Sequence, residues 1–417
     1  MPPVTLLIVG AGSRGFGYAR YAREFPDEAK VVAVAEPREA YRRRLAEEYD
    51  VPAENVFADW TQAAARERLA DAALICTPDA VHAGPAVALA EKGYHMLLEK
   101  PMAPNEADCR RIYDAVTAAG VIFAVGHVMR YTAYTQRLKQ LLDSGVIGEV
   151  VNVQHLEPVG FWHQAHSFVR GNWRNEGESS FMLLAKSCHD LDWLRYLMGA
   201  ACRRVSSFGS LHHFREANKP AGAGSRCLEC AVEADCPYSA KRIYLGRVAR
   251  GHTGWPVDVL APDVTEASVT EALRTGPYGR CVYDCDNDVV DHQVVSMEFA
   301  DGRTASFTMT AFNAGGGRQT RLFGTRGEIV GDSSEIRHYD FLSGEWETID
   351  TRAGDQTVLG GHGGGDFGLM YSFISAVGAG EPGRILSGPA ETLESHLIVF
   401  AAERARREGT VVDVPAV

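Results

Sequence analysis

The chain has 417 residues, and its 42 Lys+Arg against 54 Asp+Glu give a net charge of −12. The length predicts two or three domains of about 150 residues each. The acidic balance argues against a nucleic-acid or anionic-membrane partner, and no apolar run approaches the ~18–20 residues of a membrane helix. The first apolar stretch, Val4–Val9, is too short for a secretory signal, so we expect a cytoplasmic protein.

The first 126 residues alternate between short apolar runs and amphipathic stretches. The apolar runs predict strands at Val4–Val9, Val31–Ala35, Ala72–Thr77, His95–Glu99 and Val121–Val125. The amphipathic stretches predict helices at Arg14–Phe25, Pro37–Tyr49, His82–Lys92 and Asn105–Ala119. This alternation is typical of a parallel sheet covered by helices on both faces, so we predict a doubly wound α/β domain over residues 1–126.

The pattern changes over residues 127–417. Helices are predicted at Tyr134–Asp143, Ser187–Met198, Phe367–Val377 and Ala390–Glu408. After a strand at Val150–Leu156, residues alternate with a period of two in Val294–Phe299, Thr304–Thr310, Gly327–Gly331, Ile336–Tyr339 and Trp346–Ile349. We expect an α+β domain with a large, open and mostly antiparallel sheet.

The turn after the first strand reads Gly10-Ala11-Gly12-Ser13-Arg14-Gly15 and fits the G-x-G-x-x-G pattern of dinucleotide-binding (Rossmann) domains. Gly10 permits the tight turn, Gly12 lets the backbone approach a diphosphate, and Gly15 lets the helix pack close to the strand. A glycine-rich turn without a ligand is the alternative. The strand before it and the helix after it favour a nucleotide site.

An acidic residue, Glu36, ends the next strand 21 residues after Gly15. Its carboxylate can accept hydrogen bonds from the adenosine ribose and would repel a 2′-phosphate, which favours NAD. Arg38 leaves NADP open, because a guanidinium can hold that phosphate.

Two further segments follow strands of the predicted parallel sheet. Thr77-Pro78 and His82 follow one strand, and Glu99-Lys100-Pro101 follows the next. Both lie at the carboxyl edge, where open α/β sheets bind ligands. The candidate cofactor-binding residues are Gly10, Gly12, Ser13, Arg14, Gly15, Glu36, Arg38, Thr77, Pro78, His82, Glu99, Lys100 and His127.

Together with the glycine turn, these segments resemble the Gfo/Idh/MocA family, the glucose–fructose oxidoreductase and inositol dehydrogenase type. The resemblance spans essentially the whole chain. It implies a nicotinamide cofactor, a sugar or cyclitol substrate, and hydride transfer at a ring carbon. It also implies that Lys100 lies beside the nicotinamide and the reacting hydroxyl, and that a homo-oligomer forms through the open sheet.

The segment from Leu183 to Asp192 resembles the family segment whose Asp and His flank the substrate. His189 matches the family His, but Ala185 stands where the family has Asp, and Lys186 follows it. We therefore expect Lys100, His189 and Lys186 to be catalytic. A buried structural His189 and a solvated Lys186 are the alternatives.

Several residues around these segments could bind a sugar ring through an aromatic plane or hydrogen bonds. The expected substrate-binding residues are Arg130, Trp173, Arg174, Asp192 and His292. The sequence assigns no role to His163 and His166.

Five of the nine cysteines fall within residues 227–285, inside an expected insert at about 212–285. Cys227, Cys230 and Cys236, with Cys281 or Cys285 as the fourth ligand, could hold a structural zinc. Such a site would stabilise an insert with little core of its own. An iron–sulfur cluster and free thiols are the alternatives.

The leading interpretation is an NAD(P)-dependent dehydrogenase or reductase of a sugar, glycoside or cyclitol. The alternative is a glycoside hydrolase or lyase that oxidises the sugar transiently. A non-catalytic NAD-binding protein is a third interpretation, which the presence of Lys100 and His189 disfavours.

Overall fold

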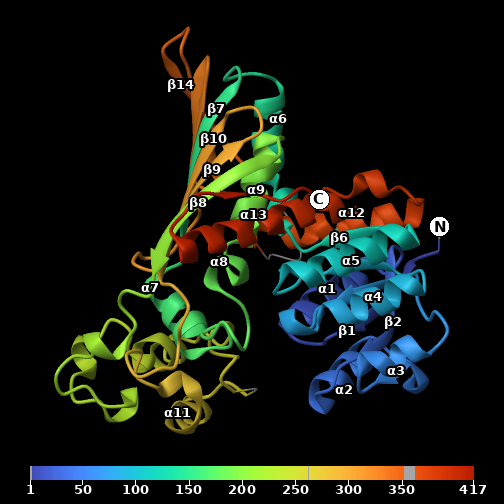
Figure 1. Ribbon diagram of the computed structural model, residues 1–417. Coiled ribbons are helices and arrows are strands. Elements are labelled where there is room, and N and C mark those ends of the chain that lie inside the picture. Colours follow the sequence, from blue (N-terminus) through green and yellow to red (C-terminus); the bar gives the residue numbers. More distant parts are fainter. Residues whose placement is uncertain (1, 262, 352–361) are drawn as a thin grey trace.

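The computed structural model describes residues 2–261, 263–351 and 362–417, and these residues form two β-sheets with an additional lobe (Figure 1). The first sheet has six parallel strands in the order β3-β2-β1-β4-β5-β6. These are β1 (Val4–Val9), β2 (Ala29–Ala35), β3 (Val56–Phe57), β4 (Ala72–Ile75), β5 (His95–Leu98) and β6 (Phe123–Val125). The predicted doubly wound parallel sheet is confirmed.

Helices cover both faces of this sheet. They are α1 (Ser13–Glu24), α2 (Glu39–Glu48), α3 (Trp60–Ala65), α4 (Ala83–Glu91) and α5 (Glu106–Ala119). Successive residues of a strand point to opposite faces, so Leu6 and Ile8 of β1 join one core and Leu7 and Val9 join the other. The sequence pattern missed the short β3 and α3.

The second sheet has nine strands in the order β14-β13-β12-β11-β7-β10-β9-β8-β15. The strands are β7 (Val150–Pro158), β8 (Cys202–Ser210), β9 (His292–Phe299), β10 (Thr304–Thr310), β11 (Gln319–Gly324), β12 (Gly327–Gly331), β13 (Glu335–Asp340), β14 (Glu345–Asp350) and β15 (Val412–Asp413). Every neighbouring pair is antiparallel except β7 and β10. The expected open, mostly antiparallel sheet is confirmed.

One face of this sheet packs on helices that were predicted from their periodicity. These are α6 (Ala133–Asp143), α9 (Cys188–Met198) and α13 (Pro389–Glu408). The helices α12 (Gly365–Ala379) and α13 also reach the first sheet: α12 adds Phe373 to one of its cores, and α13 adds Leu393 to the other. The division at residue 126 stays a prediction.

The additional lobe consists mainly of the segment between β8 and β9. It contains α10 (Gly246–Val248) and α11 (Glu266–Thr275), and in Figure 1 it lies beneath α7 (Phe161–His163) and α8 (Met182–Ala185). Its core includes Phe214, Tyr238 and Tyr244, together with Val169 from a π-helical segment at Gln164–Arg170. The expectation that this insert has little core of its own is therefore wrong.

Every helix among the described residues is too short or too polar to span a lipid bilayer.

Candidate functional site

The glycine turn has the shape that a dinucleotide requires. Gly10 has a φ of 94°, and a Cβ on Gly15 would lie 2.0 Å from the Gly10 carbonyl oxygen, so α1 packs directly on the turn. A Cβ on Gly12 would meet only an Arg38 nitrogen, at 3.5 Å. Gly12 also provides no side-chain cap for α1, which leaves the first N–H groups of the helix available to a phosphate. The turn therefore fits a diphosphate.

Glu36 lies beside this turn and is held in place by hydrogen bonds. Its carboxylate accepts from the Ala11 N–H at 2.8 Å and from Arg38 Nε and Nη2 at 2.7 and 2.9 Å. Burial alone would raise the pKa of Glu36, but these bonds outweigh it and lower the pKa. Glu36, the acid expected at the ribose, and Arg38, the guanidinium that could bind a 2′-phosphate, are therefore hydrogen-bonded to each other.

Glu99, at the end of β5, links the glycine turn to the Lys100 segment. Its Oε1 lies 2.7 Å from Arg14 Nε and 2.5 Å from the Tyr18 hydroxyl, and its Oε2 accepts from the Lys100 N–H at 3.1 Å. Arg14 also pairs with Asp366 of α12 at 2.7 Å. Burial favours the neutral acid, yet the charge of Arg14 keeps the pKa of Glu99 below its usual value. Arg14 therefore fixes the carboxyl edge of the sheet.

His82 joins the two segments that follow β4 and β5. It is fully buried, with Nε2 2.9 Å from the Thr77 carbonyl oxygen and Nδ1 2.8 Å from the Pro101 carbonyl oxygen. A side chain bonded to both loops holds them at a fixed spacing beside the turn.

The side chain of Lys100 crosses from the first sheet to the helices of the second. Its Nζ donates to the Ala185 carbonyl oxygen at 3.0 Å, at the end of α8 and four residues before His189. The ring of His189 lies 5.7 Å from that of His127, edge to face, and His127 directly follows the Gly126 turn after β6. Lys100 thus reaches the segment that carries His189, and the catalytic roles of the two residues stay a prediction.

Lys186 belongs to a buried network that the sequence did not indicate. Its Nζ lies 3.0 Å from Glu157 Oε1 on β7, and Glu157 Oε2 lies 3.0 Å from Arg318 Nε. Arg318 also pairs with Asp190 at 2.5 Å, and Asp190 accepts from His155 Nε2 at 2.9 Å. The one sequence signal for this network is that Asp190 directly follows the candidate residue His189.

Two of the expected substrate ligands, Arg130 and Asp192, form a buried ion pair with each other, and their substrate role stays a prediction. Arg130 donates through Nε and Nη2 to both Asp192 oxygens at 2.7 Å, and each side chain is only 1% exposed. Burial favours a neutral acid, but Arg130 lowers the pKa of Asp192. The structure gives this pair a supporting position behind His127, whose pKa burial lowers to about 3.

The other expected substrate ligands lie toward the insert. Arg174 binds Asp286 at 2.8 and 2.9 Å, and His292 Nδ1 lies 2.9 Å from Asp291. Trp173 is 39% exposed and contacts Phe168, with ring centroids 6.3 Å apart. Their substrate role stays a prediction.

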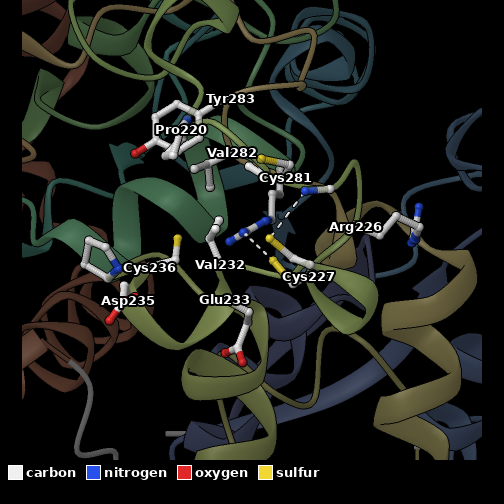
Figure 2. Close-up of a pocket in the computed structure, with 15 residues that line it drawn as sticks. Pro220, Arg226, Cys227, Val232, Glu233, Asp235, Cys236, Cys281, Val282 and Tyr283 are labelled. Carbon is white, nitrogen blue, oxygen red and sulfur yellow. Dashed lines mark hydrogen bonds between the residues drawn. The ribbon is translucent and has the colours of Figure 1, made fainter.

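The cysteine prediction is not supported. Cys227, Cys230, Cys236 and Cys281 line one cavity of about 120 Å³, and Figure 2 shows three of them on separate parts of its wall. Within residues 2–261, 263–351 and 362–417, no three His, Cys, Asp or Glu side chains are grouped to hold a metal ion.

Two physical reasons account for this outcome. The buried guanidinium of Arg170 lies 3.5 Å from Cys227 Sγ and donates to the Tyr238 carbonyl oxygen at 2.9 Å, so a cation already occupies the thiol surroundings. Burial also raises the pKa of Cys236 and Cys281, which favours thiols over the thiolates that bind metal. The insert relies on its aromatic core instead.

Comparison with known proteins gives the family. Residues 4–127 match the family model described as "Oxidoreductase family, NAD-binding Rossmann fold", and residues 139–414 match the one described as "Oxidoreductase family, C-terminal alpha/beta domain". The chain belongs to the Gfo/Idh/MocA family. The resemblance inferred from the sequence is confirmed, and the first domain of this Gfo/Idh/MocA protein is the family's NAD-binding fold.

Curated relatives are similar over part of the chain. A 2,7-anhydro-N-acetylneuraminate hydratase from Mediterraneibacter gnavus is 32% identical over 209 residues, 50% of this chain and 53% of the relative. An inositol 2-dehydrogenase from Streptomyces avermitilis is 32% identical over 202 residues, 48% of this chain and 54% of the relative. The chain thus spans about half the length of the curated relatives it matches.

Solved structures agree over the full length. Levoglucosan dehydrogenase in complex with NADH and L-sorbose has a TM-score of 0.73 at 19% identity, and the match covers 100% of both chains. A putative NADPH-dependent oxidoreductase from Desulfitobacterium hafniense has a TM-score of 0.69 at 17% identity, covering 99% of this chain and 98% of the other. At this identity the likeness establishes the fold.

Proposed function

We propose that this Gfo/Idh/MocA protein is an NAD(P)-dependent oxidoreductase that transfers hydride at a ring carbon of a sugar, glycoside or cyclitol. The observation that carries the proposal is the 3.0 Å bond between Lys100 Nζ and the Ala185 carbonyl oxygen. It brings a cation from the carboxyl edge of the nucleotide domain to the segment that carries His189. The inositol dehydrogenase relative supports a polyhydroxylated ring as the substrate.

The cofactor would be held by the residues of the glycine turn and the sheet edge. Gly10, Gly12, Ser13 and Gly15 would surround the diphosphate at the start of α1, and Glu36 would accept from the adenosine ribose. A bound nicotinamide dinucleotide supplies the carbon that accepts or donates hydride. NAD is favoured, because Glu36 is ionised beside the turn.

The proton would move between the substrate hydroxyl and the Lys100/His189 pair. Lys100 donates to a carbonyl oxygen from a partly buried position, so its ammonium is aimed and not freely solvated. His189 sits at the first turn of α9 and is 7% exposed, which places the imidazole at an internal surface. Lys186, fixed by Glu157, would stabilise negative charge on the reacting oxygen.

The hydrolase or lyase alternative retains one specific observation in its favour. Position 185 is Ala, so this chain lacks the Asp that the family places four residues before the His. A relative named as a 2,7-anhydro-N-acetylneuraminate hydratase is also compatible with chemistry that has no net oxidation. In this alternative the same Lys100 and His189 would move protons during a transient oxidation.

We infer a homo-oligomer assembled through the open face of the second sheet. Phe208 of β8 and Val294 of β9 are paired across these strands and are 66% and 42% exposed. Adjacent exposed apolar side chains on a broad sheet favour burial against another copy. Light scattering of the purified protein tests the assembly, and an F208D/V294D variant should reduce the measured mass.

A substrate panel tests the proposed activity. Purified protein is mixed with NAD or NADP and a set of sugars, cyclitols and aryl glycosides, and absorbance at 340 nm is followed. Net NADH formation supports the dehydrogenase, whereas release of the aryl group without NADH supports the alternative. Lys100→Ala should abolish turnover and leave NAD affinity nearly intact, and an unchanged rate would remove Lys100 from the mechanism.

A further inference from the structure

Trp255 belongs to the insert and presents a large aromatic surface to solvent. It lies in the segment between α10 and α11, and 50% of its surface is exposed. Three rings approach it, those of Trp162, His163 and His166, with centroids at 5.3, 5.0 and 5.4 Å. Their planes are inclined to it by 57°, 80° and 88°, so none of these three rings stacks parallel on the Trp255 indole.

The rings around Trp255 are fixed from several directions. Trp162 stacks on His163 at 28°, and the guanidinium of Arg247 lies 4.2 Å from the Trp162 ring centroid. The Phe161 N–H at the start of α7 donates to the Asn313 carbonyl oxygen at 3.0 Å, which anchors this short helix to the loop after β10. A rigid aromatic surface of this kind loses little conformational freedom when a ligand binds.

This aromatic surface adjoins the lysines of the candidate site. Trp162 follows Glu157 by five residues, and Glu157 is the carboxylate that binds Lys186 at 3.0 Å. Burial, together with the charges of Lys186 and Lys100, lowers the pKa of His163 to about 3. The His163 ring contacts both tryptophan rings, with centroids 5.7 Å from Trp162 and 5.0 Å from Trp255.

We propose that Trp255, held in place by its contact with Trp162, forms a subsite whose exposed indole stacks a second sugar ring of the substrate, next to the ring that reacts at Lys100 and His189. The inference rests on the proposed oxidoreductase function and narrows its substrate class to glycosides and oligosaccharides of at least two rings. A pyranose presents an apolar C–H face to an indole and hydroxyl groups at its rim, where the Arg247 guanidinium can donate hydrogen bonds. The insert then acts as a specificity element.

The experiment compares one-ring and two-ring substrates in the full-length protein. KM and kcat are measured with NAD and with glucose, galactose, cellobiose, maltose and lactose for the wild type, Trp255→Ala, Trp255→Phe and Trp346→Ala. Trp346 is the matched control, since it is 43% exposed and lies on β14, at the opposite end of the molecule from the insert (Figure 1).

The expected result is a lower wild-type KM for a disaccharide than for its monosaccharide. Trp255→Ala should raise the disaccharide KM about tenfold more than the monosaccharide KM, Trp255→Phe should retain most of the preference, and Trp346→Ala should retain all of it. Oxidation of monosaccharides with no disaccharide preference, or equal effects of Trp255→Ala on both, would overturn the subsite and leave the proposed function standing. A panel without any sugar oxidation would overturn both.

Discussion

Glu157 holds the ammonium of Lys186 on one oxygen and the guanidinium of Arg318 on the other. It is 4% exposed, so little water is available to replace either contact. Glu157 thus qualifies as a positioning residue for Lys186, and its removal should affect the reaction through the cation and not through a direct contact with substrate.

Glu157→Gln should lower kcat by about tenfold to a hundredfold, because Lys186 loses its anchoring charge and shifts relative to the reacting oxygen. The KM should change much less than kcat, because Glu157 acts through Lys186 and not through a direct contact with the substrate. Steady-state kinetics with the best substrate measure both constants. Glu328→Gln, which breaks an exposed pair with Arg321, is the control. An unchanged kcat, or equal changes in kcat and KM for both variants, would leave Glu157 with a purely structural role.

Asp192→Asn should destabilise the protein by about 3–5 kcal/mol, because it leaves the buried Arg130 guanidinium without its counter-charge. Urea denaturation measures the loss. Asp286→Asn is the matched control. The Asp286 side chain is 53% exposed in its pair with Arg174, so this substitution should lower the free energy of unfolding by less than about 1 kcal/mol. Wild-type stability combined with a raised KM would instead identify Asp192 as a substrate ligand.

The contact between β1 and α1 depends on the absence of a side chain at Gly15. Gly15→Ala would place a methyl group 2.0 Å from the Gly10 carbonyl oxygen, and helix and turn must then separate. We expect NADH affinity to fall by about a hundredfold or more, because the diphosphate loses the aligned N–H groups. Titration of NADH fluorescence measures it.

Gly17 provides the control for this substitution on the same helix. A Cβ at Gly17 would meet no other atom within 4 Å, and Ala is the better helix former by about 1 kcal/mol. Gly17→Ala should therefore bind NADH as the wild type does and unfold at a slightly higher temperature. Equal losses in both variants would mean that the spacing at Gly15 is unimportant.

Among the elements, those with a regular apolar period could be predicted from the sequence. The strands of the first sheet other than β3 and the helices α5, α9 and α13 have such a period, and their predicted bounds agree with the structure to within a few residues. Strand β8 lacks it: Arg203, Arg204 and Ser206 interrupt the alternation, and the strand owes its place to pairing with β9. Pairing over about ninety residues leaves no local signal.

Site residues could be predicted where a sequence motif fixes the local backbone. They could not be predicted where the tertiary fold brings together residues that are distant in the sequence. Gly10–Gly15 and Lys100 followed from their positions at strand ends. The bond from Lys100 to Ala185 involves a backbone oxygen, which no side-chain pattern reports. The contacts between Glu157, Lys186 and Arg318 join three distant segments, and Trp255 had no signal beyond being a tryptophan in a polar loop.

At the scale of the whole molecule, buried histidines make the stability depend on pH. Burial lowers the pKa of His127, His163 and His166 to about 3 and that of His396 to about 4. In the unfolded chain each titrates near pH 6.5. As pH falls below about 6.5 the unfolded state binds protons that the folded state does not, so the free energy of unfolding decreases; above this pH the stability is fully present.

The expected decrease is up to about 1.4 kcal/mol per pH unit for each of these histidines. Urea denaturation at pH 7.5, 6.5 and 5.5 measures it. His127→Phe removes one titrating group and should flatten the curve below pH 6.5, whereas His252→Gln, at an exposed position, should leave it unchanged. Parallel curves for the wild type and His127→Phe would contradict a neutral, buried His127.

The last two long helices, α12 and α13, supply Phe373 and Leu393 to the two cores of the first sheet, more than 240 residues after β6 ends. During synthesis on the ribosome, both faces of that sheet therefore stay partly uncovered until α12 and α13 have been translated. The nascent nucleotide domain cannot bury both of its cores before these helices exist, and its exposed apolar surface is available to chaperones until then. A stop codon shortly after β14 should yield insoluble protein, although every strand of the nucleotide domain has already been translated.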